Sequence, residues 1–229
     1  DKLDIVGCVC EQIELEKNLQ RFDDAIETAL TYFARVDVKI DEHPTDIQLA
    51  TEYVKTSTAL IVKKVFRLGE RGESSKRCQA IHQVLIAIAG ACYASRPRLL
   101  ALIAAQSLRN SVYDSLYPET GLAYAFFASM TLEFYGFDSR LGGFIIADQY
   151  MREARAIQSA MPNNYQARMA LVKFGNVDNW RGDQNKSIHE LFEGYKYGNQ
   201  LGDSEYALYC SAVGCCLMVT RGSLLKEIE

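Results

Sequence analysis

The stretch NLQRFDDAIETALTYF, residues 18–33, decides the fold class of this chain. It begins with a polar break at residues 18–21 and continues with apolar residues at three- and four-residue spacing, which places them on one face of an α-helix. These residues are Phe22, Ala25, Ile26, Ala29, Leu30 and Phe33. Residues 5–19 show the same spacing, so we predict that residues 1–37 form a first helical hairpin.

Helical spacing continues through the rest of the chain, whereas two-residue alternation bounded by hairpin turns is almost absent. The four prolines fall where a helical pattern stops or starts, and there a residue without an N–H group is tolerated. They are Pro44, Pro97, Pro118 and Pro162. The pattern predicts an all-α protein, with helices over residues 45–66, 73–93, 97–117 and 118–135 after the first hairpin.

Residues 120–229 show the most regular pattern. Turn clusters at 136–139, 161–164, 182–185, 202–203 and 221–222 separate segments of helix length. Hairpin starts near Thr120, Asn163 and Asp203 are about 40 to 43 residues apart, within the range of helical repeat units. Such a unit buries its apolar face by stacking on its neighbours, so we predict a stack of antiparallel hairpins with about ten helices.

We predict one helical repeat domain over residues 1–229. It comprises the first hairpin (1–37), an irregular helical middle (38–119) and the C-terminal repeat hairpins (120–229). The chain begins at Asp1 without a methionine and ends at Glu229 within a helical pattern, so we expect a fragment of a larger protein.

The composition is that of a folded soluble protein. Hydrophobic residues make up 48% and charged residues 24%, and the formal net charge of -4 argues against a nucleic-acid partner. The most apolar stretches, Ile81 to Cys92 and Leu99 to Ala105, are separated by Arg96 and Arg98. Each is shorter than the roughly 20 residues of a membrane span. We therefore expect a cytoplasmic protein without a membrane span or a signal peptide.

The seven cysteines are an odd number, and most lie among apolar residues of helical segments. This pattern favours reduced, buried thiols. We make the same prediction for the adjacent Cys215 and Cys216. Cys8 and Cys10 are separated by one residue, where structural zinc sites have two to four, so we expect no metal site. The cysteines are Cys8, Cys10, Cys78, Cys92, Cys210, Cys215 and Cys216.

No motif indicates catalysis or a cofactor. The histidines His43, His82 and His189 are far apart in sequence, and we interpret them as turn or helix-surface residues. Gly136 and the pair at 142–143 lack the lysine and the preceding strand of a phosphate loop, so close helix packing is the favoured explanation. We predict no catalytic residue, no cofactor and no metal ligand.

Aromatic residues gather towards the C-terminus. Tyr195, Tyr197, Tyr206 and Tyr209 cluster with Trp180 in the predicted hairpins. Such residues are favoured at protein interfaces and also fill the seams between stacked hairpins, which is the favoured explanation for the cluster as a whole. As a candidate partner surface we name Trp180, Tyr195 and Tyr197, beside a concave groove lined by the first helix of each hairpin.

Residues 18–26, together with Ala29 and Tyr32, resemble the turn and second helix of a tetratricopeptide repeat. Cys8 or Cys10 stands where the first helix of that repeat has its small residue, and the closing proline is absent at Asp37. The resemblance implies a right-handed superhelix of helical hairpins.

Five further segments resemble the helical region of large multidomain signalling proteins: residues 38–46, 121–125, 177–181, 201–207 and 222–225. In those proteins a STAND-type AAA ATPase module precedes tetratricopeptide-like repeats, and serine/threonine or histidine kinase domains lie at the ends. The resemblance implies a fold and a regulatory context. It brings no catalytic residues, because this chain has no Gly-x-x-x-x-Gly-Lys-Ser/Thr, His-Arg-Asp or Asp-Phe-Gly motif.

The sequence thus predicts a non-catalytic interaction and regulatory scaffold that binds a protein, a peptide or a neighbouring domain. The alternative is a helical sensor that encloses a small molecule between apolar stretches such as Ile81 to Cys92 and Leu99 to Ala105.

Overall fold

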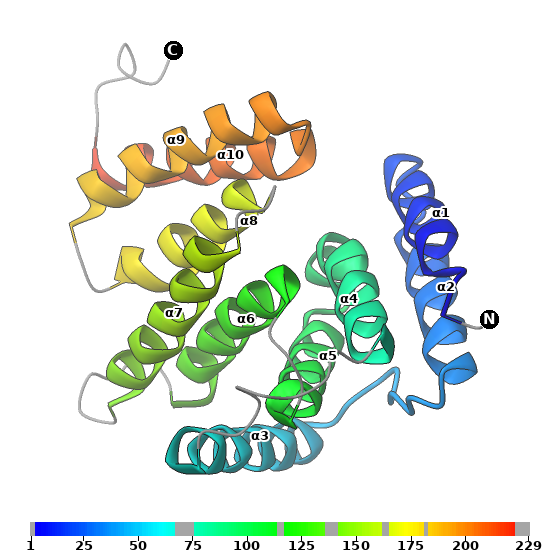
Figure 1. The fold of residues 1–229 in the computed structure, drawn as a ribbon. Helices are drawn as coiled ribbons and strands as arrows, with labels where there is room; N and C mark the ends of the chain where they lie inside the picture. The colour runs from blue at the N-terminus through cyan, green and yellow to red at the C-terminus, as the bar shows by residue number, and fades with distance from the viewer. Residues whose placement is uncertain are drawn as a thin grey trace. The chain divides into compact units, whose positions relative to one another are not determined.

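The computed structural model of the chain describes residues 3–66, 76–113, 117–135, 142–161, 165–180 and 183–222. These residues form ten α-helices and no β-strand, so the prediction of an all-α protein is confirmed (Figure 1). The chain divides into two compact units: unit 1 is Asp1–Ala123 and unit 2 is Tyr124–Glu229. The predicted turns at 69–72 and 136–139, and Pro162, lie outside the described residues.

Unit 1 begins with the predicted hairpin. Its helices α1 (Val6–Asn18) and α2 (Phe22–Arg35) pack together. The turn between them is closed by Gln20, which has a φ of 58°, and by the Arg21 N–H, which donates to the Glu16 carbonyl oxygen at 2.9 Å. The buried Glu16 carboxylate accepts hydrogen bonds from Gln12 Nε2 (2.9 Å) within α1 and from Thr28 Oγ1 (3.0 Å) of α2, and the second bond joins the two helices.

The core of unit 1 is built around α4 (Lys76–Ser95), which packs against α1, α2 and α5 (Pro97–Asn110). Nearly every residue of α4 between positions 80 and 92 is buried. By length and apolar composition α4 could also cross a membrane, but 72% of its most apolar window is buried inside the protein. Such burial is what a core helix of a folded domain shows.

The predicted helix 97–117 is too long. α5 ends at Asn110, and a 3₁₀ turn η1 (Ser111–Tyr113) follows. The buried Ser111 hydroxyl donates to the Leu108 carbonyl oxygen at 2.7 Å. A serine that bonds the backbone locally in this way competes with the helical hydrogen-bond pattern.

Helix α3 (Asp46–Phe66) packs on α5, and one buried and one partly buried polar contact join the two helices. Thr56 Oγ1 donates to the Ala105 carbonyl oxygen at 3.0 Å, and Arg109 Nε lies 2.6 Å from Glu52 Oε1. Since α3 packs on α5 while α4 packs on α2, helices in this unit do not simply pair in sequence order. The repeat-like stacking of hairpins stays a prediction.

Unit 2 contains α7 (Gly143–Ala160), α8 (Gln166–Ala170), α9 (Gln184–Leu201) and α10 (Ser204–Arg221), and the residues of α6 (Pro118–Tyr135) are divided between the units. The segment 165–180 is not one regular helix: after α8 come a π-helix η3 (Leu171–Val177) and a 3₁₀ turn η4 (Asp178–Trp180). A π-helix of this length is rare and cannot be recognised from apolar spacing.

Gly142 does not serve close helix packing, as the sequence suggested. It caps the start of α7 with a φ of 73°, and a Cβ atom placed there would meet no atom within 4 Å. Glycine is therefore needed for its left-handed backbone conformation. Gly143 is a buried residue of α7, and Gly136 lies outside the part of the chain that the structure describes.

The close packing occurs instead on α9, at Gly194 and Gly198. A Cβ atom at Gly194 would lie 2.8 Å from the Cβ of Ala170 in α8, and one at Gly198 would lie 2.8 Å from the Cβ of Ala207 in α10. The two glycines let the backbone of α9 approach both neighbouring helices.

An ion pair joins α8 to the turn between α9 and α10. Arg168 Nε and Nη2 lie 3.0 Å and 3.2 Å from the two carboxylate oxygens of Asp203, and both side chains are mostly buried. The Arg168 guanidinium also lies 4.5 Å from the ring centroid of the buried Tyr206. A planar, bidentate and stacked contact of this kind suits arginine and not lysine.

We predict that Gly198→Ala lowers the free energy of unfolding by about 1–3 kcal/mol, because the added methyl group overpacks the contact between α9 and α10. Chemical denaturation followed by circular dichroism measures this change. Gly7→Ala is the matched control, since nothing lies within 4 Å of a Cβ atom at Gly7 in α1.

The control is expected to leave stability unchanged or to raise it by up to about 1 kcal/mol. Equal stability of the Gly198→Ala variant and the unmodified chain would contradict the close approach of α9 to α10.

Candidate functional site

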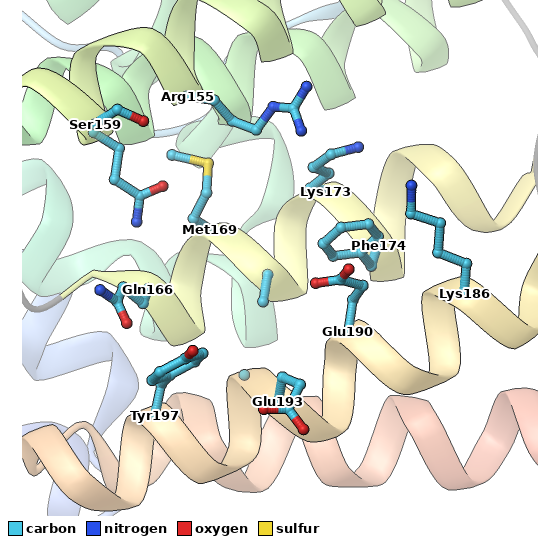
Figure 2. A pocket seen from close by; sticks show the side chains of 13 residues that line it. Arg155, Ser159, Gln166, Met169, Lys173, Phe174, Lys186, Glu190, Glu193 and Tyr197 are labelled. Carbon is cyan, nitrogen blue, oxygen red and sulfur yellow. The ribbon is translucent and has the colours of Figure 1, made fainter.

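Unit 2 has a groove of about 530 Å³ that is open to solvent and lined by α7, α8, η3 and α9 (Figure 2). It does not follow the first helices of the predicted hairpins. It lies between α7, the second helix of the hairpin predicted to start near Thr120, and the two helices α8 and α9 of the hairpin predicted to start near Asn163. Its lining residues are Arg155, Gln158, Ser159, Gln166, Met169, Ala170, Lys173, Phe174, Lys186, Glu190, Glu193, Gly194 and Tyr197.

The floor of the groove is apolar. Met169, Ala170 and Gly194 line it together with Phe174. Met169 and Phe174 are 5% and 9% exposed, so both are anchored in the core of unit 2 while an edge of each reaches the groove. Gly194 contributes no side chain to this floor.

Cationic side chains border one end of the groove. Arg155 of α7, Lys173 of η3 and Lys186 of α9 lie toward this end in Figure 2. Lys173 forms an ion pair with Asp178, and its ammonium lies 4.6 Å from the Phe174 ring centroid. Arg155 and Lys186 form no ion pair with any residue that the structure describes. Two positive charges are therefore available to a ligand.

Uncharged polar groups border the other end, where Figure 2 shows Ser159, Gln166 and Tyr197, and Gln158 also lines the groove. The α9 wall between the two ends carries two carboxylates, Glu190 and Glu193. The Lys196 ammonium lies 2.6 Å from Glu193 and donates a hydrogen bond that lowers the pKa of Glu193 below its ordinary value. The groove thus offers hydrogen-bonding groups, charges of both signs and an apolar floor.

A second hollow, of about 330 Å³, lies in unit 1 where residues 42–44 meet residues 95–99. Its charges are already used within the protein. The Arg96 guanidinium forms ion pairs with Asp23 of α2 and with Glu42 of the connector before α3. We interpret this hollow as the place where the ion pairs of Arg96 hold that connector in position.

The three aromatic residues proposed as a partner surface are all exposed. Trp180 is 60% exposed, Tyr195 39% and Tyr197 45%. The groove includes Tyr197 only, whereas Trp180 belongs to η4 and Tyr195 to another face of α9. Packing between hairpins, the explanation favoured for the C-terminal aromatic cluster as a whole, fits two of its residues. They are Tyr206, which is buried under Arg168, and the half-buried Tyr209.

The prediction that His82 is a surface or turn residue is wrong. His82 is fully buried, because α4 is covered on all sides, and its Nδ1 lies 2.9 Å from the Cys78 carbonyl oxygen. Such a histidine fills the core and meets the backbone of its own helix. His43 and His189 are exposed, as expected.

The prediction of buried thiols holds for Cys78, Cys92 and Cys210 and is wrong for Cys8 and Cys216, which are exposed. Cys10 and Cys215 are half-buried. Adjacent residues of a helix point about 100° apart, so Cys216 faces solvent when Cys215 faces inward. Burial raises the pKa of the Cys92 and Cys210 thiols to about 12.

Within the described ranges no group of three or more histidine, cysteine, aspartate or glutamate side chains is placed to hold a metal ion. Comparison of the chain with family models, with curated proteins and with solved structures found no match.

Sequence reasoning named Tyr197 but missed the other residues of the groove. One signal was available: Lys186, Glu190, Glu193 and Tyr197 follow each other at four-, three- and four-residue spacing, which places them on one face of α9. Lys173 and Phe174 carried no such signal, because their positions depend on the π-helix.

We predict that the exposed Cys8 and Cys216 react rapidly with a thiol reagent such as DTNB, while Cys92 and Cys210 react only when the chain unfolds. Burial blocks access to the latter two and keeps them protonated. Absorbance kinetics in the native protein and in denaturant measure both classes. A fast phase of unchanged amplitude in a Cys8→Ser/Cys216→Ser variant would contradict this assignment.

Proposed function

We propose that this chain is a non-catalytic protein-interaction and regulatory module, and that the unit 2 groove binds a peptide segment of a partner or of a neighbouring domain. The observation that carries the proposal is the chemistry of the groove. An apolar floor lies between two ends that carry unpaired polar groups.

A peptide segment matches this chemistry. Anchoring side chains of a peptide enter apolar pockets, while its main chain and polar side chains need hydrogen-bond donors and acceptors beside them. Phe174 and Met169 supply the apolar contact, and Gln158, Gln166 and Tyr197 supply polar groups within the same groove. The available charges of Arg155 and Lys186 favour an acidic residue at one end of the ligand.

The π-helix gives independent support for the groove as a functional site. π-helices are rare and occur frequently at functional sites. Here η3 contributes Lys173 and Phe174 to the groove, on the same wall as the Lys173–Asp178 ion pair. An irregular backbone therefore lies beside the surface that we assign to binding.

The regulatory part of the proposal rests on the resemblance to tetratricopeptide-like regions of multidomain signalling proteins with ATPase and kinase domains. In such a protein, which we place in the cytoplasm, the bound peptide would belong to a neighbouring domain or partner. Its binding in the groove would couple the position of that domain to this chain. The all-α fold is compatible with that role.

The alternative of an enclosed small-molecule site has less support. Small-molecule sites enclose most of the ligand surface, whereas the unit 2 groove is open to solvent. The stretches expected to line a cavity, Ile81 to Cys92 and Leu99 to Ala105, pack in the core of unit 1.

Tyr197 and Tyr195 provide a matched pair of variants for the binding test, because both lie on α9 and only Tyr197 lines the groove. Peptides are first selected from a displayed random library against the full chain. We predict that Tyr197→Ala weakens the selected peptides about tenfold, as truncation of an interface tyrosine commonly does. Tyr195→Ala is expected to change the affinity less than about twofold, measured by fluorescence anisotropy.

Equal effects of the two variants would contradict binding in the groove. A library that yields no binder, together with a thermal shift produced by small molecules, would favour the sensor alternative.

A further inference from the structure

The charges of the unit 2 groove follow a definite order along α9. Lys186, Glu190 and Tyr197 all line the groove from this helix. At about 1.5 Å per residue, Glu190 lies about 6 Å beyond Lys186, and Tyr197 lies roughly 10 Å beyond Glu190. Figure 2 shows the same order, with Lys186 toward the cationic end and Tyr197 toward the uncharged end. A ligand that lies along α9 therefore meets a positive charge, then a negative charge, then a phenol.

The first two of these charges are not used within the protein. Neither Lys186 nor Glu190 forms an ion pair with any residue that the structure describes. The two residues are one helical turn apart, but a lysine that precedes a glutamate by four residues is the less favourable order for an ion pair within a helix. Both charges therefore remain available to a ligand.

The other ionised groups of the groove leave a simple pattern. Lys173 and Glu193 are already paired, with Asp178 and Lys196. Arg155, on the opposite wall, has no such partner among the described residues. The unpaired charges of the groove are thus two cations at one end and, about one helical turn further along α9, one carboxylate.

The uncharged polar groups favour a ligand with an extended backbone. Gln158, Gln166 and Tyr197 offer hydrogen-bond donors and acceptors. The main chain of an extended segment needs such partners, whereas a helix bonds its own main chain and would leave them unused. Side chains two residues apart in an extended segment face the same side, about 6.6 Å apart. This spacing matches the distance of about 6 Å along α9 from Lys186 to Glu190.

We propose that the groove selects an extended peptide that carries an acidic and a basic residue two positions apart, the acidic one against Arg155 and Lys186 and the basic one against Glu190. This inference rests on the proposed function and names the class of peptide that the groove binds. Complementary charges across an interface fix the register of a ligand and exclude wrong partners more than they add affinity. The charge order therefore determines which peptides bind, while the apolar floor contributes to the binding of all of them.

An exchange of the two charges on α9 tests this order. The double variant Lys186→Glu/Glu190→Lys keeps the net charge of the chain, and a glutamate four residues before a lysine is the favourable order in a helix. The fold is therefore expected to be unchanged, which circular dichroism checks. The probe is the tightest peptide that a displayed random library yields against the full chain and that Tyr197→Ala weakens. It is synthesised in three forms: as selected, with its acidic and basic residues exchanged, and with both replaced by glutamine.

We expect the selected peptide to contain the acidic and basic pair and to bind the unmodified chain at least tenfold more tightly than its charge-exchanged form, measured by fluorescence anisotropy. The double variant is expected to reverse this preference. The glutamine form is the matched control and binds both chains with affinities within about twofold of each other. Arg155→Gln is expected to weaken the selected form about threefold and to leave the glutamine form unchanged.

The possible outcomes separate this inference from the proposed function. Selected peptides that depend on Tyr197 and lack the charge pair, or a preference that the double variant does not reverse, would overturn the charge order and leave peptide binding in the groove intact. A library without any binder that depends on Tyr197 would overturn both.

Discussion

The structure of unit 2 depends on the close approach of α9 to α8 and α10. Gly194 and Gly198 allow it, because the Cβ atoms of Ala170 and Ala207 on the neighbouring helices lie only 2.8 Å from where an added Cβ atom would be. At such separations the helix backbones set the packing, and no larger side chain can enter without moving a helix. Gly194, which makes the close contact with α8, also lines the groove, so a larger side chain there would change both the packing and the groove.

Polar contacts in both units fix the positions of helices that apolar packing brings together. Arg168 reaches Asp203 in unit 2, and Arg109 reaches the buried Glu52 in unit 1. Removing water from two charges costs much of what their attraction gains, so such pairs add little net stability. Losing one partner would leave a buried charge uncompensated, however, and each pair therefore disfavours every packing except the one in which both partners meet.

Much of the fold could be predicted from the sequence, because apolar spacing determines helices directly: the boundaries of α1, α2 and α6 agree closely with the predicted ones. The wrong predictions concern residues whose burial is determined by tertiary contacts. His82 is buried because α4 is covered on every side, and Cys216 is exposed because α10 is the last described helix of its unit. Of the groove only Tyr197 was foreseen, since the groove is built from four elements, one of which is a π-helix. The repeat stacking and the signalling resemblance stay predictions.

The π-helix also affects how the groove is encoded. Its i→i+5 hydrogen bonds enclose one residue more than those of an α-helix, so the wall at 171–177 depends on the number of residues as well as on their identity. Deleting one residue there would remove the extra residue and let the segment close into an α-helix, while the residues beyond it keep nearly the same direction. The side chains inside the segment would change their directions instead, and Lys173 and Phe174 line the groove from there. In this wall a change of length, unlike a single replacement, alters the backbone hydrogen-bond pattern of the whole segment at once.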